Sequence, residues 1–214
     1  GPLRSPNRLQ NSFANECFMD EVAASLGHDP LIFRRMHLAD NRLIDVMHEA
    51  ARAANWESRP SPKRGNARTG VVSGRGMAIL LYEGDNGYSC IIAEVEVNQE
   101  TGAINVKKFI QCQDSGPTSN PDGLKNQMEG GTMQGMSRAL REEVRWDDFG
   151  VTSVDWRRYN AFRFGEFVPE FVNVVLDRKG EQQMGAGEGT ITIAAAAIGN
   201  VTWTPELHHA GHHH

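Results

Sequence analysis

Three strand-like segments in the middle of the chain constrain its fold more than any other feature. They cover residues 77–82, 88–97 and 104–110, and all three are rich in β-branched or aromatic residues, which favour extended backbone. The polar stretch 98–102 is a turn signal between the second and the third. The pattern predicts a three-stranded meander, joined later in the chain by a further strand over 171–176.

Three helices are predicted ahead of these strands. Residues 11–12 can cap the first one, and Gly27 is placed to end it. Asp29 and Pro30 match the N-cap and first helical position of a second, shorter helix. A third helix carries apolar residues along one face over 43–54. The sequence therefore predicts a helical layer before the sheet.

The chain divides best where proline, glycine and basic residues interrupt the apolar pattern. We expect a helical segment over 1–56, a linker or loop over 57–70, and a sheet-and-helix part over 71–205. The His-rich tail at 206–214 is typical of an expression remnant. The predicted fold class is α/β (α+β): a mixed sheet with packed helices, preceded by a helical layer.

A long helix and a hairpin are predicted after the meander. The helix begins at Asn120 and contains Gly130 and Gly131 in its interior, where each glycine costs about 1 kcal/mol relative to alanine. Such a pair indicates either ligand approach or close packing of the helix on the sheet, and both explanations stay open. The hairpin is expected from 143–146 and 151–157.

Composition excludes several classes of function. The chain has 214 residues and a net charge of −5, so no basic excess indicates nucleic-acid binding. No run of 18 apolar residues or signal peptide is present, and the compartment stays open. Cys17, Cys90 and Cys112 lack the spacing of an iron–sulfur or zinc site and are expected to be small apolar fillers.

A single carboxylate, Glu188, stands in the glycine-rich run 185–189 just before an alanine-rich segment. Flanking glycines allow close approach of a bulky group, so this glutamate can be presented to a ligand. Burial there would raise its pKa toward neutrality and make it a better general base. The ordinary alternative is a solvated turn residue.

Several further motifs appear in one order and carry a family resemblance. They are LRSPNR (3–8), FANE (13–16), MDEVA (19–23), GHDP (27–30), FR (33–34), GRGMA (74–78), AEVEV (93–97), NPDG (120–123), QMEGG (127–131), QG (134–135), GE (187–188) and AAAIGN (195–200). With them the chain resembles the C-terminal part of the molybdenum-binding subunit of the xanthine oxidase/aldehyde oxidase family. It is most similar to nicotinate dehydrogenase and isoquinoline oxidoreductase type subunits.

The resemblance implies an oxidoreductase that hydroxylates an N-heteroaromatic or aldehyde carbon with oxygen from water. The cofactor it implies is molybdenum-molybdopterin, in the cytosine dinucleotide form, and Glu188 maps onto the family's general base. Gln127 maps onto a pterin-binding glutamine, and Arg4 maps onto a loop beside the metal. Gly187 of the motif is carried over as a cofactor contact. An ordinary helix amide and an exposed terminal arginine are the alternatives for Gln127 and Arg4.

The sequence also departs from the family pattern. Gly189 stands where the family usually has proline, and we expect Glu188 to be less firmly held as a result. Family subunits are several times longer, so we expect this chain alone to hold no molybdenum and to be inactive. The implied partners are an N-terminal molybdenum-binding segment or subunit and an iron–sulfur subunit. A non-catalytic scaffold of the same fold is the alternative, and a dinucleotide site lacks its sequence context.

Overall fold

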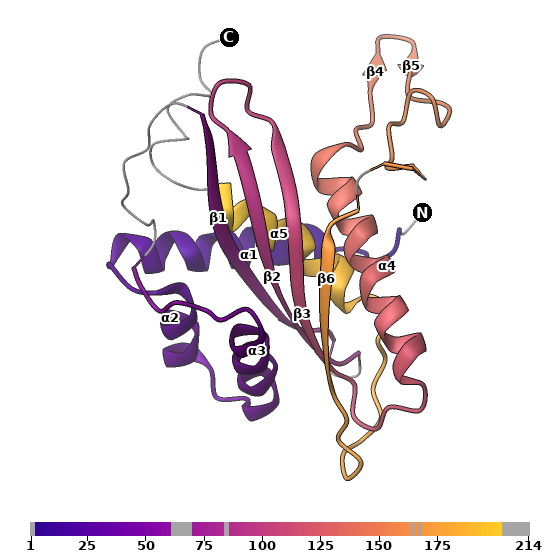
Figure 1. Ribbon diagram of the computed structural model, residues 1–214. Coiled ribbons are helices and arrows are strands. Elements are labelled where there is room, and N and C mark those ends of the chain that lie inside the picture. Colours follow the sequence, from indigo (N-terminus) through magenta and orange to yellow (C-terminus); the bar gives the residue numbers. More distant parts are fainter. Residues whose placement is uncertain (1–2, 61–69, 84–85, 164, 167, 203–214) are drawn as a thin grey trace.

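A four-stranded mixed sheet lies at the centre of the molecule (Figure 1). The computed structural model describes residues 3–60, 70–83, 86–163, 165–166 and 168–202. The first three strands in the sheet order are antiparallel neighbours, and the last is parallel to the third. In that order, the strands are β1 (Val71–Leu81), β2 (Tyr88–Asn98), β3 (Ile104–Asp114) and β6 (Glu170–Leu176). The predicted meander and the further strand are confirmed, with longer strands than the sequence indicated.

Alternation along the strands buries both faces of this sheet. On β1, Ala78 and Leu80 belong to one apolar cluster together with Tyr82 just after the strand, while Met77 and Ile79 belong to the cluster on the opposite face. Successive strand residues point to opposite sides, so two separate helical layers are needed to cover them.

Five helices in the described part of the chain supply these layers. One face is covered by α3 (Asn41–Ala53), with Leu31 of α2 (Pro30–His37) in the same cluster. The other face is covered by the alanine-rich α5 (Gly189–Thr202), and α1 (Arg8–Ser25) and α4 (Pro121–Leu140) pack against α5. The mixed α/β fold with packed helices is confirmed. No helix within the described ranges is both long and apolar enough to cross a membrane.

Helix starts follow local backbone conformation. Asp29 caps α2 as predicted, because its carboxylate accepts hydrogen bonds from the backbone amides of Leu31 and Ile32 at 2.9 and 3.0 Å. The predicted start of α1, with its cap at residues 11–12, is wrong. Asn7 adopts a left-handed conformation with φ 60°, so the helix begins directly after it, at Arg8.

The predicted hairpin is shorter than expected and projects from the end of α4 (Figure 1). Its strands are β4 (Trp146–Asp147) and β5 (Gly150–Val151), and Phe149 at its tip is 100% exposed. No layer packs on this arm in the described part of the chain, which explains why pairing stops after two residues. Most of the predicted linker, at 61–69, and the His-rich tail lie outside the described residues.

The paired glycines of α4 meet different surroundings. A Cβ built at Gly131 would collide with the Thr190 hydroxyl and lie 3.3 Å from the Ile191 amide, whereas a Cβ at Gly130 meets no atom within 4 Å. The close neighbour is therefore α5, and packing of this glycine on the sheet was the wrong explanation.

Alanine substitutions at these two adjacent positions should have opposite effects on stability. Gly131→Ala is expected to lower the free energy of unfolding by about 1–3 kcal/mol through overpacking against α5. Gly130→Ala is expected to raise it by up to about 1 kcal/mol, since alanine is the better helix former and finds open space. Urea denaturation of both variants measures the difference, and effects of the same sign and size would contradict the α4–α5 contact.

Candidate active site

Three of the four residues that the sequence assigned to a site meet at one backbone carbonyl, and the fourth, Glu188, is the next residue in the chain. The Gly187 oxygen accepts hydrogen bonds from Arg4 Nε at 2.8 Å and from Gln127 Nε2 at 3.0 Å, and Arg4 Nη2 donates to it as well. Arg4 Nη1 also donates to Gln134 Oε1 at 3.1 Å. Residues from the two ends of the chain and from α4 are thereby brought to the residue preceding Glu188.

The Glu188 carboxylate is held at both oxygens. The Ser5 amide donates to Oε1 at 2.8 Å, and the Tyr82 hydroxyl donates to Oε2. These donors, together with the Arg4 charge, hold the pKa of Glu188 below its usual value although partial burial acts in the opposite direction. The expected rise of this pKa toward neutrality is therefore wrong, because donors from distant parts of the chain outweigh burial.

Glu188 also occupies the start of α5. Its carbonyl accepts from the Thr192 amide at 3.3 Å, which is the first hydrogen bond of the helix, and the Thr192 hydroxyl donates to the same oxygen at 2.6 Å. A helix N-terminus favours a negative charge at this position. The next residue, Gly189, is buried, and a Cβ there would collide with the Ser89 hydroxyl. The expectation that the missing proline leaves Glu188 less firmly held stays a prediction, and both carboxylate oxygens have donors in this structure.

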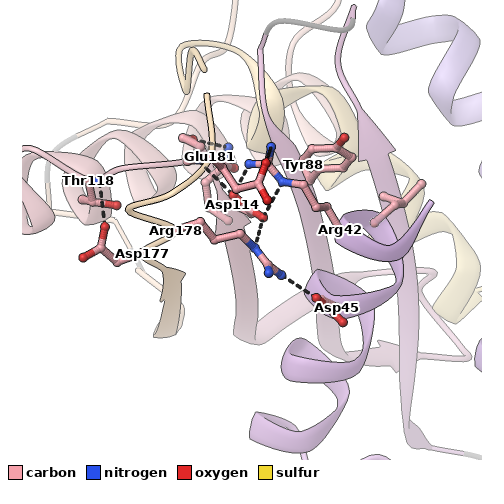
Figure 2. A network of polar contacts seen from close by, with 12 residues as sticks. Arg42, Asp45, Tyr88, Asp114, Thr118, Asp177, Arg178 and Glu181 are labelled. Atoms are coloured by element: carbon pink, nitrogen blue, oxygen red, sulfur yellow. Dashed lines mark hydrogen bonds and ion pairs between the residues drawn. The ribbon is translucent and has the colours of Figure 1, made fainter. Parts of the chain in front are cut away.

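The loop 177–188 leads from β6 to Glu188. It is anchored by the buried carboxylate of Asp114 (Figure 2). Arg42 of α3 donates to Asp114 through Nε at 3.0 Å and Nη2 at 2.6 Å. Arg178, just after β6, donates to Asp114 through Nε at 2.6 Å and pairs with Asp45 of α3 at 2.5 Å. The network ties the first residues of the loop to the end of β3 and to α3.

Backbone contacts extend this anchoring along the loop. The Arg178 amide donates to the Gly116 carbonyl at 3.1 Å, and the Met184 amide donates to the Ser115 carbonyl at 2.8 Å. Hydrogen bonds from Arg42, Gly116 and Arg178 hold the pKa of Asp114 below its ordinary value against the effect of burial. The loop therefore reaches Glu188 as an ordered segment.

One side of α4 presents two amide side chains and an uncovered glycine to the same region. Gln127, Gly130 and Gln134 are all exposed, and their spacing of three and four places them on one face of the helix. Amides offer a donor and an acceptor together, and Gly130 leaves room above the backbone. This surface fits the polar edge of a planar heterocycle such as a pterin. Within the described ranges, no three His, Cys, Asp or Glu side chains gather into a metal-binding group.

An open cavity of about 940 Å³ lies next to this region, between α4 and the arm that carries the hairpin. Gln134 lines both the cavity and the site. Its walls are mainly apolar and aromatic and include Leu3, Met133, Trp156, Tyr159, Phe162 and Val168. Such a surface suits apolar side chains or an aromatic ring.

Sequence reasoning missed several residues of this site. Ser5 and Tyr82 contact Glu188 across 183 and 106 positions of the chain, and Asp114 binds two arginines that are 72 and 64 positions away. No local spacing indicates these pairs. The signals that were present are modest: a tyrosine closing a strand, and an aspartate ending another strand among apolar residues.

Comparison with known proteins gives consistent matches over most of the chain. The molybdopterin cofactor-binding domain family matches residues 36–166. A nicotinate dehydrogenase subunit of Pseudomonas putida is 33% identical over 204 residues, covering 92% of this chain and 17% of that protein. The beta subunit of isoquinoline 1-oxidoreductase from Brevundimonas diminuta is 30% identical over 199 residues, covering 92% of this chain and 24% of that protein. The chain thus spans less than a quarter of the length of these relatives.

Solved structures support the same fold. The aldehyde oxidoreductase of Desulfovibrio desulfuricans superposes with a TM-score of 0.76 over 94% of this chain and 39% of its own, at 15% identity. The aldehyde oxidoreductase of Desulfovibrio gigas does so with a TM-score of 0.70 over 93% and 39%, also at 15% identity. Because the family match covers more than half of the chain and the relatives agree with it, the chain belongs to the molybdopterin cofactor-binding domain family of xanthine oxidase type proteins.

Proposed function

We propose that this chain supplies one part of the active site of a molybdenum hydroxylase, with Glu188 as its general base. The observation that carries the proposal is the convergence of Arg4 and Gln127 on the carbonyl of Gly187, directly before Glu188. The two donors lie 123 positions apart in the sequence, yet they meet beside the only carboxylate of the glycine-rich loop. Residues with separate structural roles would have no reason to donate to the same carbonyl oxygen.

The cofactor side of the site is proposed to be the exposed face of α4. Gln127 and Gln134 would hold the pterin edge, Gly130 would allow its approach, and Arg4 would balance its negative charge. When bound, the molybdopterin cofactor, proposed in its cytosine dinucleotide form, would supply the redox chemistry. The chain itself would orient that group and move a proton.

Glu188 suits the role of proton acceptor in its present state. A pKa below the usual range keeps the carboxylate ionised at neutral pH, so it is ready to take a proton from the water-derived oxygen. An ionised carboxylate has about four lone-pair positions, and Ser5 and Tyr82 use two of them. Acceptor positions therefore remain for the reacting proton. The proposed substrates are N-heteroaromatic rings or aldehydes.

Completion of the site is proposed to need an upstream molybdenum-binding segment or subunit, and electrons would leave through an iron–sulfur partner. The exposed apolar side chains beside the site support the first of these contacts. Leu3 is 68% exposed, Trp156 75% and Val168 61%, and all three line the cavity next to Gln134. Apolar surface of this kind marks an interaction face.

The molybdenum content of the assembled protein tests this proposal. We expect about one molybdenum per complex when the chain is produced with its upstream segment in a host that makes the cofactor. The chain purified alone is expected to contain none. Stoichiometric metal in the isolated chain would contradict the shared site. A stable complex without metal would favour the non-catalytic scaffold.

A further inference from the structure

Tyr82 lies where the end of β1 meets the site. Its side chain packs in the apolar cluster below α5, the residue is 2% exposed, and its hydroxyl reaches Glu188 Oε2. A tyrosine in this position combines a fixed apolar ring with one polar atom directed at the carboxylate. The packing of the ring therefore determines where that polar atom lies.

We propose that Tyr82 is a positioning residue for Glu188: its hydroxyl fixes Oε2 while the Ser5 amide fixes Oε1, so that the carboxylate enters the reaction ionised and in one orientation. This inference rests on the proposed function of Glu188 as the general base. It assigns to Tyr82 a task that the glycine-rich motif alone does not provide.

The second donor to the Glu188 carboxylate, the Ser5 amide, is held as rigidly as the Tyr82 hydroxyl. Ser5 is 2% exposed and adopts a left-handed conformation with φ 64°, which aims its amide at Glu188. Its hydroxyl lies 2.6 Å from the Thr192 hydroxyl, which in turn donates to the Glu188 carbonyl at 2.6 Å. A non-glycine residue holds such a backbone only when its surroundings determine it. Both donors are therefore preorganised before any ligand arrives.

Charged groups lie on both sides of the Tyr82–Glu188 pair, and Tyr82 is the neutral partner in it. Arg4 faces Glu188, and Arg138 lies behind Arg4 and donates to its carbonyl at 2.8 Å. On the Tyr82 side, the Arg8 guanidinium lies 5.8 Å from the ring centroid and pairs with Glu83. Burial and the bond to Glu188 raise the pKa of Tyr82 to about 12, so it stays a donor throughout the neutral range.

Deleting one hydroxyl tests the inference without changing any charge. In Tyr82→Phe, the Glu188 carboxylate loses a donor that favours its ionised form, so its pKa should rise. Carbon-detected NMR titration of this chain, with the Glu188 signal assigned by its loss in Glu188→Gln, should show a midpoint about one pH unit higher than in the wild type. Incorporating 3-fluorotyrosine at residue 82 strengthens the donor and should move the midpoint the other way.

A matched control is available on the opposite face of the sheet. Tyr88 is 8% exposed, and its hydroxyl donates to Asp40 Oδ2 at 3.1 Å, so Tyr88→Phe deletes an equivalent group remote from Glu188. It should leave the Glu188 midpoint unchanged. In the assembled enzyme, Tyr82→Phe should move the acid limb of the pH–rate profile to higher pH, because the base is lost sooner as pH falls.

The outcomes separate this inference from the proposed function. A folded Tyr82→Phe protein whose Glu188 midpoint equals that of the wild type overturns the positioning role, as does an unmoved midpoint in the fluorotyrosine protein. Either result leaves the role of Glu188 as base to be decided by Glu188→Gln. Circular dichroism of each variant shows that it is folded. The fluorotyrosine protein keeps both the ring and the hydroxyl, so it still tests the inference if Tyr82→Phe does not fold.

Discussion

Replacing Glu188 by glutamine should reduce turnover of the assembled enzyme by about 10²–10⁴-fold, the usual contribution of a positioned general base. Glutamine has the same shape and can still accept from the Ser5 amide through its oxygen, while its NH₂ group donates to the Tyr82 oxygen. It cannot take up a proton. The loss should therefore appear in kcat, with little change in KM.

Two measurements identify the cause of that loss. The molybdenum content of Glu188→Gln should equal that of the wild type, because its hydrogen bonds can be kept. Its thermal midpoint should fall only slightly, through loss of the negative charge at the start of α5. Glu100→Gln makes the same chemical change in an exposed turn between β2 and β3 and should retain full turnover. Full activity in Glu188→Gln would instead assign the chain to the scaffold alternative.

Local patterns predicted the parts of this site that depend on neighbouring residues. The glycine-rich motif located Glu188 just before the alanine-rich segment that forms α5, and Asp29 with Pro30 marked the start of α2 correctly. Both features depend on backbone hydrogen bonds within a few residues. Enrichment in β-branched and aromatic residues likewise located β1 to β3, because a sheet buried on two faces needs continuous apolar segments.

The properties that long-range contacts determine could not be predicted in this way. The direction of the Glu188 pKa shift depends on a donor at residue 5 and another at residue 82, which no spacing near the motif indicates. The close packing of Gly131 and of Gly189 depends on Thr190 and Ser89, respectively. In each case the local sequence pattern identifies the residue, and a tertiary contact determines its pKa or its packing.

Arg34 gives the largest expected change in stability. Its guanidinium is 1% exposed and pairs with Glu16 at 3.0 Å and with Asp20 at 2.5 Å, both of which are themselves largely buried. Glu16 also accepts from the Ile79 amide at 2.9 Å, so the cluster joins α1 and α2 to β1. Arg34→Met leaves two buried carboxylates without a counter-charge. We expect the free energy of unfolding to fall by about 3–5 kcal/mol.

The neighbouring residue provides the control. Arg35 is exposed on the same helix, and Arg35→Met should change the free energy of unfolding by no more than about 0.5 kcal/mol. Urea denaturation of both variants at one pH compares a buried and an exposed arginine with the same side-chain change. A loss below about 1 kcal/mol for Arg34→Met would show that the cluster contributes little to stability.

The pH dependence of the Arg34→Met deficit provides an independent check. Burial raises the pKa of Asp20 to about 6 even beside Arg34, and removing that charge should raise it further. Its folded pKa then lies above the unfolded value of about 3.9, so the folded state binds more protons between these two values. Stability therefore falls as pH rises through this window, and the deficit of Arg34→Met should be smaller at pH 5 than at pH 8. A deficit independent of pH would instead indicate that the lost packing of the arginine side chain, not the unpaired carboxylates, causes the destabilisation.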